Sequence, residues 1–146
     1  MSRLASPEFG AIMDDFYNSP LVRTDFSDDV AWQALVEAAT AESPDGFRAY
    51  LKIINDSTFE GSSAAELVER GEGWEDAAVL FVADGEAIRD SEQPILCVDL
   101  VDQPGRSFRC IPAELWGVDN NLSLANMDFE EFAEAVDDRG IHRGFA

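Results

Sequence analysis

Apolar residues along the chain gather in short runs whose length suits β-strands. The runs Ala77–Ala83 (AAVLFVA) and Ile95–Val101 (ILCVDLV) are almost continuously apolar. Such runs are typical of central strands that are covered on both faces. Weaker patterns predict three further strands, at Leu21–Phe26, Phe47–Ile54 and Ser107–Ile111. A short helix over Gly46–Lys52 is the alternative for the second of these three.

Between these runs, apolar residues recur at helical spacing behind residues that can cap a helix. The clearest stripe is Trp32, Leu35, Val36 and Ala39, at positions i, i+3, i+4 and i+7. A side chain that can accept a hydrogen bond from the first turn precedes each predicted helix. We expect three helices: one capped by Ser27 that ends near Glu42, one capped by Ser63 that ends before Gly71, and one capped by Asp128 that ends before Gly140.

The order of these elements is strand, helix, strand, helix, strand, strand, strand, helix. Strands that alternate with helices predict parallel pairing, and the turn Gln103-Pro104-Gly105 predicts an antiparallel return. We therefore expect an α/β fold: a single-layer mixed sheet of about five strands with three helices packed on it. Residues 20–146 form one domain in this prediction, and residues 1–19 form a mobile N-terminal arm. Within the arm, Ser6-Pro7-Glu8-Phe9 resembles the remnant of a cloning site, and Met13 could be the natural start.

The composition adds a strong negative charge to this picture. The 146 residues are 46% hydrophobic, as in globular proteins, but 30 Asp and Glu face 10 Lys and Arg, which gives a net charge of −20. Because the acidic residues are spread along the chain, we expect the charge to lie on the folded surface. Such a surface repels nucleic acid and anionic membranes and attracts basic proteins. The alternative is that the charge serves only solubility or adaptation to salt.

The cysteines and the hydropathy of the chain indicate in which cellular compartment the protein is expected. Cys97 and Cys110 lie in apolar runs, so we expect buried free thiols, although the two could face each other across a hairpin in a suitable register. The first residues lack the apolar region of a signal peptide, and no run is long enough to span a bilayer. We therefore expect a cytoplasmic protein without membrane contact.

The chain offers few groups for metal or nucleophilic chemistry. Two cysteines and one histidine cannot supply the four ligands of a structural zinc site. The histidine, His142, lies near the C-terminus between Arg139 and Arg143, and we expect it on the surface. The phosphate-binding patterns GxGxxG and GxxxxGK[ST] do not occur. No cofactor is therefore predicted.

Three aspartates support an alternative, enzymatic hypothesis. Asp25 and Asp84 each follow a predicted strand, where α/β folds place ligands, and Asp99 lies within one. Together these carboxylates could serve a metal-dependent hydrolase. A phospho-receiver site would also need a lysine near the end of a later strand, and no lysine follows Lys52, the only one in the chain.

The most distinctive segment is Pro112–Phe132 (PAELWGVDNNLSLANMDFEEF). Asparagine tolerates unusual backbone conformations and bonds to the local backbone, so a structured connection is the favoured interpretation. The alternative is a binding loop anchored by an aromatic side chain. Its candidate partner-binding residues are Trp116, Asp119, Asn120, Asn121 and Asn126.

Several stretches of the chain are characteristic together: LVRTDFSDDVAWQALV, VLFVAD, ILCVDL, RCIPAELWGVDNNLSLANMDFEEFAEAV and a closing RGF. In these stretches the chain resembles a family of small acidic proteins, common in actinobacteria, that is described only as a domain of unknown function. The resemblance spans roughly Leu21–Phe145 and implies no activity.

These observations favour a non-enzymatic module that binds a basic protein through electrostatic complementarity. An immunity or inhibitor protein against a basic nuclease-type toxin and a mimic of nucleic-acid charge are two forms of this hypothesis. The alternatives are the metal-dependent hydrolase and an accessory domain whose charge serves only solubility.

Overall fold

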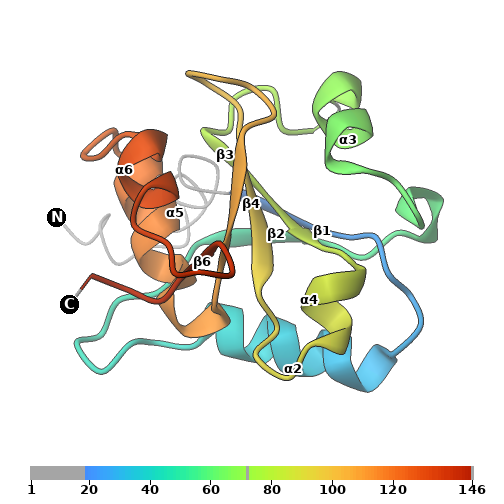
Figure 1. Ribbon diagram of the computed structural model, residues 1–146. Helices are drawn as coiled ribbons and strands as arrows, with labels where there is room; N and C mark the ends of the chain where they lie inside the picture. Colours follow the sequence, from blue (N-terminus) through green and yellow to red (C-terminus); the bar gives the residue numbers. More distant parts are fainter. Residues whose placement is uncertain (1–18, 72, 146) are drawn as a thin grey trace, which may run out of the picture.

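One mixed sheet forms the centre of the molecule. The computed structural model describes residues 19–71 and 73–145, and within them six strands are ordered β2-β1-β3-β4-β5-β6 (Figure 1). Strand β4 runs antiparallel to both of its neighbours, whereas the other neighbouring strands pair in parallel. The strands are β1 (Ser19–Arg23), β2 (Leu51–Ile54), β3 (Val79–Ala83), β4 (Ile95–Asp99), β5 (Ser107–Cys110) and β6 (Ile141–His142).

Helices occupy the connections between the strands. In the described residues these are α2 (Asp29–Thr40), α3 (Ala64–Arg70), α4 (Gly85–Arg89), α5 (Leu115–Ser123) and α6 (Phe129–Ala133), with short 3-10 turns η2 (Ser57–Phe59) and η3 (Pro112–Glu114). The prediction of an α/β fold with a single mixed sheet is therefore confirmed. The sheet has one strand more than the expected five, and five α-helices replace the expected three.

The sheet is covered on both faces, which explains the continuous apolar runs. Leu21, Phe81 and Cys97 belong to a core with α2, α4, α5 and α6. The alternate residues Val22 and Leu80 belong to a second core, which Phe59, Leu67 and Trp74 close from the other face. Figure 1 shows α3 on the opposite side of the sheet from α2 and α4. Successive side chains of a strand point to opposite faces, so a strand buried on both must be apolar throughout.

Two expected boundaries in the first half are wrong. Asp28, not Ser27, caps α2, because its side chain accepts a hydrogen bond from the amide of Ala31 at 3.0 Å. Ser27 instead donates its backbone N–H to Asp25 at 2.9 Å. Only the last part of Phe47–Ile54 forms a strand, β2, and the rest is an irregular loop that is neither strand nor helix.

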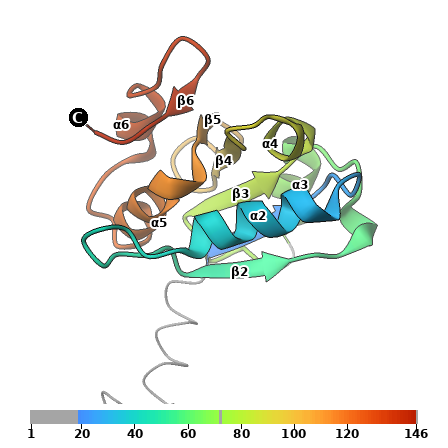
Figure 2. The ribbon, with the colours of Figure 1, turned by 90° about the horizontal axis from the view of Figure 1, so that it is seen from below.

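Several short elements were absent from the prediction. Helix α4 follows β3 directly, α5 lies within the segment Pro112–Phe132, and β6 adds an edge strand next to β5. Figure 2 shows α5, α6 and β6 gathered at one end of the sheet. Ser19, which we placed in the N-terminal arm, is the first residue of β1, and residues 1–18 lie outside the described residues.

The two cysteines are buried free thiols, as expected. In the hairpin of β4 and β5, Cys97 pairs with Phe108 and Cys110 with Ile95, so the thiols are diagonal neighbours rather than directly opposed. Burial, followed by the neighbouring Cys110, raises the pKa of Cys97 well above its usual value. Such thiols are chemically inert while the protein is folded.

In the described part of the chain, no helix combines the length and the hydropathy needed to cross a membrane.

Candidate functional site

The segment that we singled out from the sequence is structured throughout. It folds as η3, α5, a turn and the start of α6. Leu115, Val118 and Leu122 anchor α5 in the core on the side of the sheet that also carries α2. Ala125, in the turn after α5, has a backbone φ of 57°, which residues other than glycine rarely adopt.

Trp116 lies against the loop before β2. Its ring stacks on Phe47 with 5.1 Å between the ring centroids and 12° between the planes. The indole Nε1–H is buried and has no hydrogen-bond partner among the described residues, whereas Phe47 is 51% exposed. This geometry gives Trp116 a part in holding the Ser43–Tyr50 loop.

Asp119 is not a surface residue, so its assignment to a partner contact is wrong. Its side chain is completely buried and accepts hydrogen bonds from the hydroxyls of Ser19 and Ser123 and from the backbone N–H of Tyr50 at 2.8 Å. Burial raises the pKa of Asp119 to about 6, although these hydrogen bonds act in the opposite direction. The carboxylate therefore joins α5 to the start of β1 and to the loop before β2.

The three asparagines of the segment differ in accessibility. Asn121 donates from its side chain to the carbonyl of Gly117 at 2.8 Å and is half-buried, as is Asn120. Asn126 is exposed in the turn between α5 and α6. Of the predicted contact residues, only Asn126 is fully presented to solvent.

The three aspartates of the hydrolase hypothesis do not come together. Asp25 and Asp84 lie at the carboxyl ends of β1 and β3, which are neighbours in the sheet. Asp99 pairs with Val79 at the opposite end of β3, roughly 15 Å away along the strand. Asp99 is buried and accepts backbone hydrogen bonds from Val101, Asp102 and Gln103, so it shapes the loop after β4.

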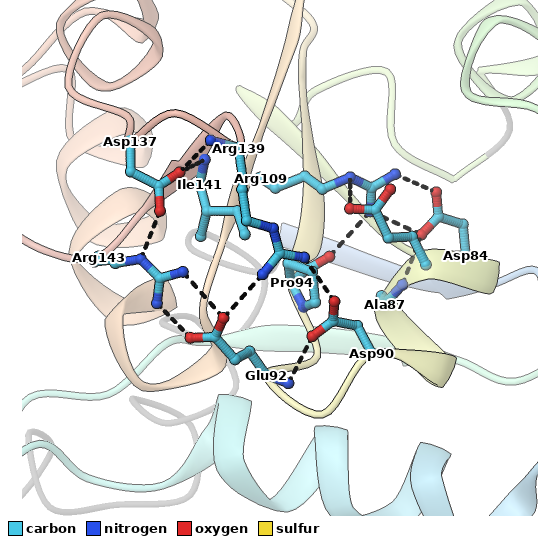
Figure 3. Close-up of polar contacts among 11 residues, drawn as sticks. Asp84, Ala87, Asp90, Glu92, Pro94, Arg109, Asp137, Arg139, Ile141 and Arg143 are labelled. Carbon is cyan, nitrogen blue, oxygen red and sulfur yellow. Dashed lines mark hydrogen bonds and ion pairs between the residues drawn. The ribbon is translucent and has the colours of Figure 1, made fainter.

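Arginines hold the other two aspartates. Arg109 of β5 makes two hydrogen bonds to Asp84, at 2.7 and 2.9 Å, and Asp84 also caps α4 through the amide of Ala87 (Figure 3). Arg89 donates to Asp25 at 2.9 Å. The hydrogen bond from the Ser27 side chain is the main cause that lowers the pKa of Asp25, and Arg89 adds to it.

A second group of ion pairs fastens the C-terminal segment to the loop after α4; we call it the C-terminal clasp. It consists of Arg139, Arg143, Asp90, Glu92 and Asp137 (Figure 3). Arg139 lies 2.7 Å from Asp90 and 3.1 Å from Glu92, while Arg143 contacts Glu92 and, at 2.8 Å, Asp137. The hydrogen bond from Arg143 is the largest cause that lowers the pKa of Asp137 to about 2.

Arg23 is a buried cation that the sequence pattern did not reveal. Its side chain is 3% exposed, pairs with Asp29 at 2.8 Å and lies over the rings of Phe26 and Trp32, at 4.4 and 5.3 Å. The segment LVRTDF contains two charged residues, and nothing in its pattern indicated that Arg23 would be buried. The guanidinium is stabilised here by a carboxylate and by two aromatic faces.

The expectation of a surface position for His142 is wrong. The side chain is 2% exposed, and its Nδ1 lies 3.1 Å from the carbonyl oxygen of Ala135. Its ring makes edge contacts with Phe132 and Phe145, at 5.3 and 4.9 Å between centroids. The pairing of β6 with β5 carries His142 into this aromatic cluster, a long-range effect that local sequence does not report.

Neither the arginine-bound aspartates nor other groups form a metal centre. Within residues 19–71 and 73–145, no three or more His, Cys, Asp or Glu side chains are arranged to hold a metal ion. The contacts of Asp84, Asp25 and Asp99 are those of residues that stabilise loops, helix ends and strand ends.

Most of the described arginines form ion pairs with carboxylates. Seven of the arginines in the described residues lie within reach of a carboxylate: Arg23, Arg48, Arg89, Arg106, Arg109, Arg139 and Arg143. By contrast, residues 56–76 carry seven acidic residues and a single basic one, Arg70. Arg70 lies 4.6 Å from the ring centre of Phe59. Negative charge is therefore in local excess over η2, α3 and the turn that follows, as it is over residues 128–138, which carry six acidic residues and no basic one.

We call this surface the α3 acidic face and define it by six exposed carboxylates: Asp56, Glu60, Glu66, Glu69, Glu75 and Asp76. Two of them also cap helices, since Asp56 accepts from the amide of Thr58 and Glu66 from that of Ser63. The other four make no ion pair with another described residue.

No curated protein matches the chain. A family model described as "Domain of unknown function (DUF6924)" matches residues 18–145, which include every described residue. The chain therefore belongs to the DUF6924 family, as its characteristic stretches indicated.

Proposed function

We propose that this protein is a non-enzymatic binding module whose α3 acidic face engages a basic protein. The observation that carries the proposal is the local excess of negative charge: seven of the described arginines are tied into ion pairs elsewhere, while the α3 acidic face holds six exposed carboxylates near one arginine and Lys52, whose Nζ lies beside Gly73. A face of one sign raises the rate of encounter with a partner of opposite sign and disfavours partners of like sign.

The strand-end carboxylates support a binding role over a catalytic one. A general acid, base or metal ligand must keep an oxygen available to its substrate or metal. Asp84 is engaged by Arg109 and by the first turn of α4, and Asp25 by Arg89 and Ser27. These carboxylates are better suited to stabilising the carboxyl edge of the sheet.

Asn126 is the predicted contact residue that fits this proposal best. It is exposed, and it lies next to Met127 and Asp128 in the turn before α6. Trp116, Asn120 and Asn121 lie on the α5 side of the molecule, where they pack against the loop before β2 or bond to their own helix. We assign these three a structural part.

An inhibitor of a basic toxin and a mimic of nucleic-acid charge are the two specific forms of the proposal. Both would use the same face, and they differ in whether the captured partner is a toxin or a nucleic-acid-binding protein. The two buried free thiols suit a reducing compartment, which supports our proposal of a cytoplasmic protein.

The test is capture of partners from a lysate of the source cell at low and at high salt. The bait is compared with a variant in which Glu60, Glu69 and Glu75 are changed to Gln and Asp76 to Asn. A matched control carries Glu37→Gln, Asp45→Asn, Glu134→Gln and Asp138→Asn, which remove the same charge from exposed positions outside the face.

We expect a basic protein that is retained by wild type and by the control, is lost with the α3 variant, and is released by salt. If wild type returns no basic protein at low salt, or if both variants lose it equally, the proposal is wrong and the charge serves solubility alone.

A further inference from the structure

A cavity lies at the amino end of β3, beside the turn between α5 and α6. Its volume is about 190 Å³. Ala78, two residues beyond Asp76 of the α3 acidic face, and Ala125, in the turn after α5, both line it. A single water takes up about 30 Å³, so the cavity is large enough for a side chain rather than a lone water.

The walls of the cavity are largely apolar. They are formed by Val101, Leu122, Met127 and Phe129. Val101 is 63% exposed, whereas Leu122 and Phe129 belong to the core below. An unbranched, polarizable side chain such as Met127 adapts readily to an occupant. This wall suits an aliphatic chain that enters from solvent.

Carboxylates complete the lining. Asp99 is satisfied by backbone amides of the loop after β4, so its oxygens already have partners. Asp102 and Asp128 also line the cavity and are exposed, and Asp128 accepts a hydrogen bond from the first turn of α6 through one part of its carboxylate. The nearest ion-paired cation on the β4–β5 loop, Arg106, lies 3.8 Å from Glu130 rather than at either of these two carboxylates.

A cavity with apolar walls and exposed carboxylates at its opening has the chemistry to bind a lysine side chain. Lysine buries its aliphatic stem along apolar surface while its ammonium stays with water or a carboxylate. Building on the proposed function, we infer that this cavity seats a lysine side chain of the basic partner, with its stem along Val101 and Met127 and its ammonium at Asp102 and Asp128. In the view of Figure 1, α3, the β4–β5 loop and α6 lie along the upper side, so a partner on the α3 acidic face could reach the cavity.

The inference is tested with short peptides in place of the unidentified partner. Acetyl-Gly-Lys-Gly-amide is titrated into the isotope-labelled full chain at low salt, and its norleucine counterpart, which keeps the stem and lacks the charge, is titrated in parallel. We expect saturable shifts of the backbone amides of residues 100–103 and 125–129 with the lysine peptide. The norleucine peptide should bind about tenfold more weakly.

Variants of the chain sharpen the result. Asp102→Asn should weaken the lysine peptide about tenfold, because the ammonium loses a charged partner, and Val101→Ser should weaken both peptides by removing apolar wall. Asp45→Asn removes the same charge from an exposed turn far along the chain and should leave both affinities within about twofold.

Equal affinity for the two peptides, or shifts centred on α3 rather than on the cavity, would overturn the inference. Either result leaves the proposed function standing if the basic partner is still captured from the lysate. Failure of wild type to capture a basic protein, with the peptide result intact, would overturn the proposed function and keep the cavity as a lysine site.

Discussion

At the scale of single residues, the main lesson is how a buried carboxylate is used. Asp119 is completely buried, yet it has no basic partner among its contacts and is stabilised by two hydroxyls and an amide. Hydrogen bonds favour the charged form, but the loss of hydration outweighs them and leaves the pKa at about 6. Asp119 thus fixes α5 to β1 at some cost to stability at neutral pH.

Replacement of Asp119 by Asn is expected to remove a pH dependence of stability. The folded pKa of about 6 exceeds the ordinary value of 3.8, so the contribution of this group is fully present below about pH 3.8 and is lost as the pH rises through about 6. Relative to wild type, the free energy of unfolding of the Asn variant should therefore rise by up to about 3 kcal/mol between about pH 4 and pH 7. Urea denaturation across this range measures the difference.

The Asp45→Asn variant serves as the control, since it removes an exposed carboxylate and changes the net charge equally. A constant difference in unfolding free energy between Asp119→Asn and wild type would show that Asp119 ionises in the folded protein as it does in the unfolded chain.

At the scale of elements, strands and helices with long regular sequence patterns could be predicted, whereas short elements could not. The central strands β3 and β4 and helix α2 could be predicted, because runs of buried residues and a helical stripe leave a strong local signal. Helix α4 has five residues and begins with a glycine, so neither periodicity nor propensity marks it. Strand β6 exists because β5 offers it an edge to pair with, which is a tertiary effect.

The candidate site was harder to predict from the sequence than the fold, because it also depends on contacts between residues that are far apart in the chain. The sequence indicated that Asp25 and Asp84 follow strands and that Asp99 lies within one, but not that β4 runs antiparallel to β3 and carries Asp99 to the far edge. Nor does local sequence report which arginine meets which carboxylate. Arg109 and Asp84 are 25 positions apart, and Arg143 and Glu92 are 51 positions apart.

The C-terminal clasp is expected to protect β6 from local opening. Glu92 contacts both Arg139 and Arg143, and Asp137 accepts a hydrogen bond from the amide of Ile141 at 3.0 Å. In Glu92→Gln the two arginines lose a shared charge, so the amide of Ile141 should exchange its hydrogen several-fold faster at low salt. Hydrogen exchange followed by NMR measures this rate.

Glu42→Gln is the matched control, because Glu42 pairs with Arg48 in a similarly exposed position away from β6. Unchanged exchange at Ile141 in the Glu92 variant would mean that pairing with β5 alone holds the segment.

At the scale of the whole molecule, the net charge of −20 dominates. The described arginines stabilise particular edges, but the 10 basic residues of the chain cannot offset the repulsion among its 30 acidic residues. Part of that charge has local roles in capping helices, as Asp28, Asp84 and Glu66 do. The exposed carboxylates that have neither a cap nor an ion pair repel one another and destabilise the domain.

Salt is therefore expected to stabilise the protein. Ions screen repulsion between exposed carboxylates, and this gain should exceed the weakening of the fewer exposed ion pairs. The melting temperature should rise between about 10 mM and 300 mM NaCl, by about 3 °C for each kcal/mol of repulsion that is screened. Thermal unfolding followed by circular dichroism measures the shift, and a fall in melting temperature with salt would contradict the expectation.

The central claim is that the α3 acidic face binds a basic protein by charge. Its most direct test is a calorimetric titration of the captured partner with wild type, the α3 variant and the matched control over a range of salt. The account predicts that affinity for wild type falls about tenfold or more between about 50 and 200 mM salt, and that the α3 variant binds at least about tenfold more weakly at low salt. The control should bind as wild type does. An affinity that is independent of salt, or that is the same for all three proteins, would contradict it.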